Sequence, residues 1–295
     1  MIRLMEKLHS DILNKLPIKV VEAKFNYRYF IIKDNIGNVY HLHKINKNSY
    51  LTYYELIRSK NVQKAIFELK NDDTYFLLFE MPFKKSEKKA VLKDILETLE
   101  QIHNDFKFKV TLKKEYFKNL QNIYRVLDNR FSYLELRIRE IETSPKKNDT
   151  SWVVLSKYNV FLDAKIFLYD LQQDIFKIID NNESIIYGLV YNYLNTDMYK
   201  NGVIEPIFDL YYAPYSSLLV RYFLEFDELD IYELLIEKIK KIDKFNQKYF
   251  CFMCLYIYVL NVRLDVMLNE FNISCYLLIA KKIKFFLNKF GDYMK

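Results

Sequence analysis

The chain has 295 residues, of which 51% are hydrophobic and 28% are charged, and its formal net charge is +7. This length is sufficient to bury the core of one large domain or of two packed lobes. Only four glycines are present and no two lie close together, which excludes a P-loop or a G-x-G-x-x-G turn. Basic and acidic residues alternate along the chain, which argues against a nucleic-acid-binding face, and the enrichment in Lys, Asn, Ile, Tyr and Phe is typical of an AT-rich bacterial genome.

The first 83 residues predict a small antiparallel sheet with one helix. An amphipathic helix over residues 1–16 ends before Pro17, and residues 34–37 form a hairpin turn with Gly37 at a position of positive φ. Helical spacing over residues 50–60 places Leu51, Tyr54, Leu56 and Ile57 near one face. The predicted strands are residues 19–23, 27–33, 38–45, 64–69 and 74–80.

From Ser86 onward the hydrophobic period is helical, and residues 185–197 are the irregular stretch that is compatible with strands. We place a single boundary near Pro82–Ser86, which gives a β-rich lobe over 1–83 and a helical lobe over 84–295. The fold class predicted is therefore α+β. The expected helices are residues 89–104, 113–142, 156–180, 229–241, 247–260, 264–271 and 275–290.

The chain is expected to be soluble and cytoplasmic, with no membrane span. Its most apolar stretch, residues 249–260, falls short of the about 20 residues that a spanning helix needs. The three cysteines fit a reducing compartment. Cys251 and Cys254 form a C-x-x-C inside an apolar helix, where we expect them to pack in the core and not to bind metal.

Several segments resemble the protein-kinase-like fold, in the branch of the aminoglycoside and choline phosphotransferases, and are most similar to bacterial spore-coat kinase-like proteins. The resemblance implies that Lys44, at the end of the third strand, contacts nucleotide phosphates and that Glu55 on the next helix is its partner. The other similar segments are Leu77–Pro82 at the hinge, Leu96–His103 with its L-x-x-L-H pattern, Ser156–Leu162 before a long helix, and Pro206–Leu210 with its P-x-x-D-L pattern.

The catalytic loop of this family does not match. It reads H-G-D-x-x-x-x-N, followed by a strand pair and then an Asp that holds Mg²⁺, whereas here Tyr191 stands in the place of the His and Tyr193 in the place of the Asp. The 15 residues between Tyr193 and Asp209 scarcely hold a strand pair and a metal-binding segment; within them, Asp197 has a plausible spacing for the metal ligand. A tyrosine, with a pKa of about 10, replaces a carboxylate poorly in either role at neutral pH.

His41 and His43 form an H-x-H on a strand, so both side chains point to the same face. This spacing suits a metal, but the sequence identifies no third ligand, so exposed or cross-strand paired histidines are favoured over a metal site. Lys44 also has a simpler interpretation as a solvated lysine at a strand end. His103 is expected to complement a helix terminus.

Three functions stay open. The favoured one is a catalytically degenerate, pseudokinase-like scaffold with no catalytic residue, metal or cofactor, which binds a protein partner, in spore-coat assembly as the resemblance implies. The second is an active small-molecule phosphotransferase that uses ATP and Mg²⁺ through Lys44, Glu55 and Asp197. The third is a helical interaction protein unrelated to kinases, in which the first 83 residues do not form a sheet. The sequence leaves the oligomeric state undetermined.

Overall fold

The computed structural model describes residues 10–26, 28–81, 88–111, 114–145, 149–181, 184–194, 196–200, 202–206, 208–226, 229–262, 264 and 270–291. The chain divides into two compact units. The first unit comprises residues 1–107 and 188–213, and the second comprises residues 108–187 and 214–295. The boundary expected near Pro82–Ser86 lies outside the described residues, and so does most of the helix expected over 264–271.

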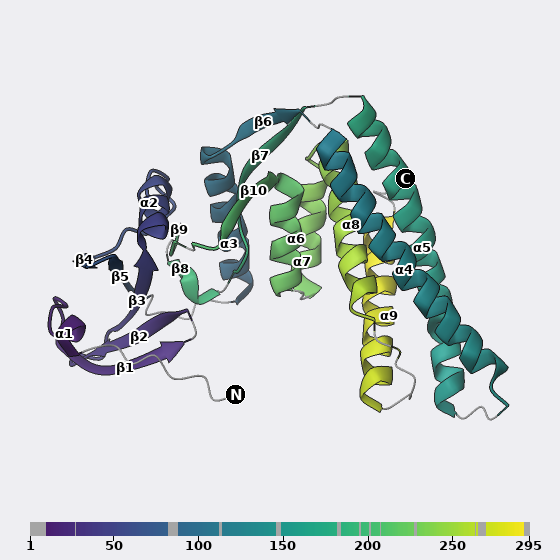
Figure 1. The fold of residues 1–295 in the computed structure, drawn as a ribbon, viewed down its shortest axis with the longest axis horizontal. Helices are drawn as coiled ribbons and strands as arrows, with labels where there is room; N and C mark the ends of the chain where they lie inside the picture. Colours follow the sequence, from purple (N-terminus) through teal and green to yellow (C-terminus); the bar gives the residue numbers. More distant parts are fainter. Residues whose placement is uncertain are drawn as a thin grey trace. The chain divides into compact units, whose positions relative to one another are not determined.

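The first unit is built on a five-stranded antiparallel sheet with the strand order β1-β2-β3-β5-β4 (Figure 1). This sheet confirms the predicted α+β fold and contradicts the interpretation as a purely helical protein. Its strands are β1 (Val20–Asn26), β2 (Tyr29–Asp34), β3 (Val39–Asn46), β4 (Phe67–Asn71) and β5 (Thr74–Glu80).

The turn between β2 and β3 has the predicted chemistry. Gly37 has a φ of +96°, which side chains rarely tolerate. The Asp34 carboxylate accepts hydrogen bonds from the backbone N–H groups of Ile36, at 2.9 Å, and Asn38, at 2.8 Å. These contacts fix the register in which His41 and His43 follow on β3.

Helix α2 (Lys47–Leu56) covers one face of the sheet, with only part of the face that was predicted. Tyr53 and Leu56 are buried, whereas Leu51 and Tyr54 are 56% and 46% exposed. The helix begins three residues earlier than expected, where Asn46 caps it by accepting from the Ser49 N–H. Tyr53 is then anchored because its hydroxyl accepts a hydrogen bond from the Ala65 N–H at 2.8 Å.

The first unit also contains residues that the sequence assigned to the helical lobe. These form α3 (Lys88–Asp105), the 3₁₀ helix η1 (Thr196–Met198), the short strands β8 (Tyr199–Lys200) and β9 (Val203–Ile204), and most of β10 (Leu210–Pro214). β8 and β9 pair antiparallel, so the expectation that residues 194–208 scarcely hold a strand pair is wrong. The pair fits because each strand has only two residues and the turn between them is equally short.

The second unit is mainly helical. Its aromatic core includes Phe223, Phe250 and Phe286, whose rings meet edge-to-face or tilted. Cys251 and Cys254 are fully buried there, as predicted, and burial raises the pKa of the Cys251 thiol to about 12. Strand β6 (Phe108–Thr111) pairs with residues 184–187 of β7 (Ser184–Tyr191). The helices of this unit are α4 (Lys114–Thr143), α5 (Asp149–Asp180), α6 (Tyr215–Phe226), α7 (Leu229–Ile239), α8 (Lys244–Leu260) and α9 (Glu270–Phe290).

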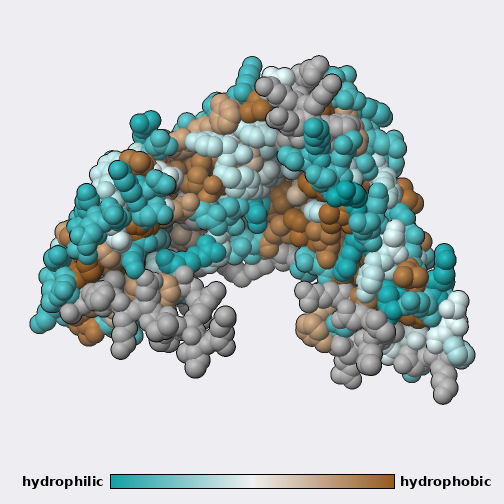
Figure 2. Space-filling view, viewed as in Figure 1, coloured by the Kyte–Doolittle hydropathy of each residue, from teal (hydrophilic) through white to brown (hydrophobic). Residues whose placement is uncertain are grey.

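The surface agrees with the mixed composition of the sequence. Hydrophilic residues are spread over both units on the face shown in Figure 2, with smaller hydrophobic patches among them. Within the described part of the chain, no helix combines the length and the apolarity that crossing a membrane requires.

Candidate functional site

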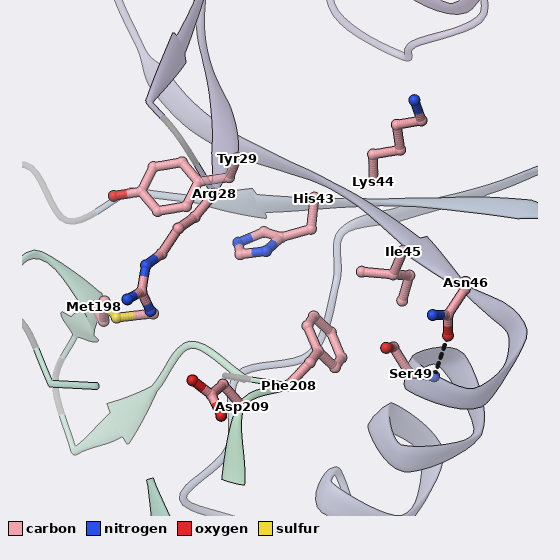
Figure 3. A pocket seen from close by; sticks show the side chains of 10 residues that line it. All are labelled: Arg28, Tyr29, His43, Lys44, Ile45, Asn46, Ser49, Met198, Phe208 and Asp209. Atoms are coloured by element: carbon pink, nitrogen blue, oxygen red, sulfur yellow. Dashed lines mark hydrogen bonds between the residues drawn. The ribbon is translucent and has the colours of Figure 1, made fainter. Parts of the chain in front are cut away.

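A pocket of about 400 Å³ opens in the first unit beside β3, within the size range of small-molecule sites (Figure 3). Its wall combines cationic, aromatic and amide side chains with one carboxylate. The lining residues are Arg28, Tyr29, His43, Lys44, Ile45, Asn46, Ser49, Met198, Phe208 and Asp209.

The three residues expected to hold a nucleotide are placed differently. Lys44 borders the pocket, but strand alternation sends its exposed side chain to the face opposite His43, and Figure 3 shows it pointing away from Phe208 and Asp209. Glu55 is exposed on α2 and lies outside the pocket lining. Asp197 belongs to η1, which precedes the strand pair; its side chain is not among those described.

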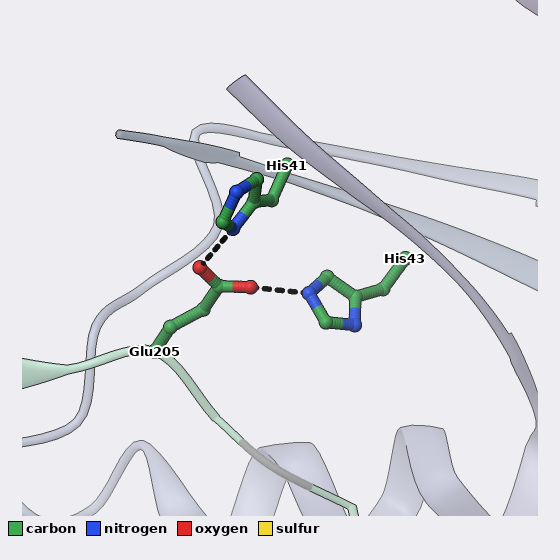
Figure 4. A group of neighbouring side chains, drawn as sticks. All are labelled: His41, His43 and Glu205. Atoms are coloured by element: carbon green, nitrogen blue, oxygen red, sulfur yellow. Dashed lines mark hydrogen bonds and ion pairs between the residues drawn. The ribbon is translucent and has the colours of Figure 1, made fainter. Parts of the chain in front are cut away.

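The inner face of β3 instead presents His41 and His43 to a buried carboxylate, that of Glu205 (Figure 4). His41 Nδ1 lies 2.7 Å from Glu205 Oε2, and His43 Nε2 makes a short contact with Oε1. The three residues are only 1%, 6% and 1% exposed, respectively. Burial acts to raise the pKa of Glu205, but the hydrogen bonds from the two histidines outweigh it and hold the pKa at about 2.

Backbone pairing fixes the position of Glu205. It directly follows β9, where the Ile204 N–H donates to the Asn61 carbonyl at 2.8 Å and the Gln63 N–H donates to the Ile204 carbonyl at the same distance. The Glu205 N–H in turn donates to the carbonyl of Met198, also at 2.8 Å. The carboxylate is therefore carried on a segment that is hydrogen-bonded on both sides.

Aromatic rings enclose the two imidazoles. The Tyr29 ring lies over His41 with centroids 3.9 Å apart, and 5.2 Å from the ring of His43. Phe79 and Phe208 meet His43 edge-on, with centroids at 5.5 and 5.9 Å. These contacts limit the rotation of both histidines.

The two tyrosines that the resemblance aligns with catalytic residues lie in different environments. Tyr191 is 2% exposed, its hydroxyl has no hydrogen-bond partner within the described part of the chain, and burial raises its pKa. The Arg28 guanidinium stacks 3.8 Å from the centroid of the Tyr193 ring. Asn192 lies between these two tyrosines in the sequence, and its side-chain amide donates a hydrogen bond to Asp209 Oδ1 at 2.6 Å.

No protein-family model matches the chain, and no curated protein matches its sequence. Among solved structures, the chain is similar to an aminoglycoside phosphotransferase from Alicyclobacillus acidocaldarius, with a TM-score of 0.62, 11% identity, and coverage of 99% of this chain and 98% of that one. The chain has a kinase-like fold of the aminoglycoside phosphotransferase type. A second similar structure is the GDP complex of aminoglycoside 2'-phosphotransferase-IIIa, with a TM-score of 0.46, 14% identity, and coverage of 92% and 96%.

Within this kinase-like fold, the residue that follows the strand pair is Glu205. The pattern implied by the resemblance expects the Mg²⁺-holding Asp after a strand pair, whereas Asp197 lies before β8 and β9. Sequence reasoning missed Glu205 because it treated the segment as too short for the strands. The signal that was available is an acidic residue directly after the apolar pair Val203-Ile204.

The residues around Glu205 do not fit Mg²⁺. This ion prefers an octahedron of oxygens and keeps several waters. Here both carboxylate oxygens contact imidazole nitrogens, and the group is buried.

Proposed function

We propose that this kinase-like protein acts by binding a protein partner and does not transfer phosphoryl groups. The observation that carries the proposal is the contact of both Glu205 oxygens with His41 and His43, directly after the strand pair that the resemblance expects before a Mg²⁺-holding carboxylate. Phosphoryl transfer depends on positioning and charge stabilisation, to which that ion is central. A buried carboxylate whose two oxygens already contact imidazole nitrogens is poorly placed to hold the hydrated Mg²⁺ ion of a nucleotide.

The two tyrosines support the same conclusion. A catalytic base must reach the acceptor hydroxyl and take its proton near neutral pH. Tyr191 is buried with a raised pKa, and the ring of Tyr193 is covered by Arg28. Neither side chain meets the requirement.

The partner class comes from the resemblance to spore-coat kinase-like proteins, which implies protein binding in coat assembly. An affinity capture with the full chain from sporulating bacterial cells tests this part. A coat protein that binds the purified chain directly supports it. A failure of direct binding by every captured protein contradicts it.

Thermal unfolding with and without ATP and Mg²⁺ tests the absence of phosphoryl transfer. A ligand at 100 times its Kd stabilises a protein by about 2.7 kcal/mol, which is easily seen. We expect no Mg²⁺-dependent rise in Tm at millimolar ATP and no release of phosphate. A Mg²⁺-dependent rise that is lost in both Lys44→Ala and Asp197→Ala contradicts the proposal and supports the phosphotransferase.

A further inference from the structure

The cluster of His41, His43 and Glu205 has the donor set of a transition-metal site. Their ligating atoms all lie within 4.8 Å of one another. A divalent ion such as Zn²⁺ lies about 2.0–2.2 Å from imidazole nitrogens and carboxylate oxygens, so tetrahedral ligands are about 3.3–3.5 Å apart. The 2.7 Å between His41 Nδ1 and Glu205 Oε2 widens to this value with a shift of less than 1 Å.

The charge of the cluster favours a cation. A buried carboxylate that stays ionised needs a compensating charge, and buried charges in proteins are paired or coordinate metals. Two neutral imidazoles only donate hydrogen bonds and leave the cluster with a charge of about −1, whereas a divalent ion held by the same atoms gives about +1 and directs every lone pair to one centre. For this, each imidazole stays neutral with its proton on the ring nitrogen that faces away from Glu205, so that the other nitrogen offers its lone pair to the ion.

The donor types select the ion. Two imidazole nitrogens and one carboxylate suit Zn²⁺ and neighbouring first-row ions, while Mg²⁺ and Ca²⁺ require mainly oxygens. Three protein ligands leave a fourth position, which is typical of a metal that also binds a water or a ligand. His43 lines the 400 Å³ pocket, so this position has an approach from solvent.

The surroundings provide the outer shell that such sites need. Tyr29, Phe79 and Phe208 fix the two rings, and Asn61 and Met198 fix the backbone around Glu205. We therefore propose that His41, His43 and Glu205 bind one divalent transition-metal ion, represented by Zn²⁺. The proposal does not depend on whether the chain transfers phosphoryl groups.

The test uses the full chain after removal of metals with a chelator. Zn²⁺ is titrated in competition with a chromogenic chelator, and Co²⁺ is used as a spectroscopic probe. We expect one Zn²⁺ per chain, no competition from millimolar Mg²⁺, and intense visible Co²⁺ bands of a four- or five-coordinate site. A folded chain that binds no stoichiometric Zn²⁺, or Co²⁺ with only the weak spectrum of the hydrated ion, overturns the proposal.

Variants separate metal binding from packing. His43→Gln and His41→Asn keep an amide that donates to Glu205 but lose the imidazole ligand. Loss of an outer-shell partner costs about 10–100-fold in metal affinity, so loss of a ligand is expected to weaken Zn²⁺ binding by at least about 100-fold. Lys44→Gln, on the opposite face of the same strand, is the matched control and keeps full affinity. Unchanged affinity in both histidine variants overturns the assignment.

This test contains no nucleotide, so it fails or succeeds separately from the ATP experiment. Circular dichroism of each metal-free variant verifies that it is folded before titration. If one histidine variant does not fold, the other variant and the Co²⁺ spectrum of the wild-type chain still decide the outcome.

Discussion

The first unit buries histidines in two different environments. His41 and His43 share a carboxylate, that of Glu205, whereas His103 on α3 faces a backbone carbonyl, with its Nε2 lying 3.3 Å from the oxygen of Ala213. All three side chains are nearly inaccessible, with 1%, 6% and 2% exposed. Burial is therefore common to both environments, and the partner of each ring makes the difference.

The difference indicates which of these histidines are able to bind a cation. Burial lowers the pKa of His103, although the Ala213 carbonyl and Glu100 act in the opposite direction. The His41 and His43 rings, which share the Glu205 carboxylate, can instead turn a nitrogen lone pair toward a cation. His103 is thus a packing residue, and the pair on β3 is a candidate site.

The largest expected effect is that of Glu205→Ala in the metal-free chain. Removing one partner of a buried polar cluster costs about 3–5 kcal/mol, because the groups left behind are unpaired. Urea unfolding measures the loss. A change below 1 kcal/mol would show that the cluster is not closed in solution.

A triple variant sharpens this result. Replacing His41, His43 and Glu205 together by Leu removes all the buried polar groups at once. Apolar replacement of a whole buried polar cluster is often neutral or stabilising. We expect the triple variant to be more stable than Glu205→Ala; the reverse order would mean that the cluster itself stabilises the fold.

Gly188→Ala tests the packing of His103. An added Cβ would lie 2.3 Å from the backbone oxygen of His103 and 2.5 Å from its Nδ1, so α3 or β7 must shift. Overpacking of this kind costs about 1–3 kcal/mol. Gly291→Ala is the matched control: its Cβ meets only Phe167, at 3.9 Å, so we expect a change within about 0.5 kcal/mol. Equal stability of the two variants in thermal unfolding would contradict the close contact.

A smaller effect is expected for His103, which contributes to the pH dependence of stability. Its folded pKa is lowered, so below the unfolded value of about 6.5 the unfolded chain binds the proton more readily. The stability contributed by the neutral ring is therefore present above about pH 6.5 and is lost as the pH falls. We expect His103→Leu to lose less stability than the wild type between pH 7.5 and 5.5 in urea unfolding. Parallel pH profiles of the two proteins would contradict the assignment.

Local patterns in the sequence were sufficient to predict most of the fold. The strand alternation, the turn at Gly37 and the helical periods depend on neighbouring residues, and the structure has these elements at nearly the predicted positions. Helix α2 shows the limit of this reasoning, because the buried face depends on where the Asn46 cap starts the helix. Leu51 and Tyr54 were expected on the buried face, whereas Tyr53 is the residue buried there.

The candidate site was only half predictable. The H-x-H on β3 indicated two side chains on one face, but the third member is 162 residues away from His43 along the chain. Only the pairing of β8 with β9 and the contacts of residues 61–63 bring Glu205 to them. The acidic residue after Val203-Ile204 is visible in the sequence, but no local pattern indicates that it meets histidines so far away along the chain.

The smallest expected effect concerns Lys44 near the end of β3 and the exposed face of α2. Lys44 and Glu55 are solvent-exposed, and substitutions at such positions usually change stability by less than about 0.5 kcal/mol. We expect Lys44→Ala and Glu55→Ala to leave both urea unfolding and Zn²⁺ affinity unchanged, in contrast with every substitution on the inner face. A loss of more than 1 kcal/mol in either variant would show that this side chain is engaged in structure or binding, and would remove the contrast with the buried histidine pair.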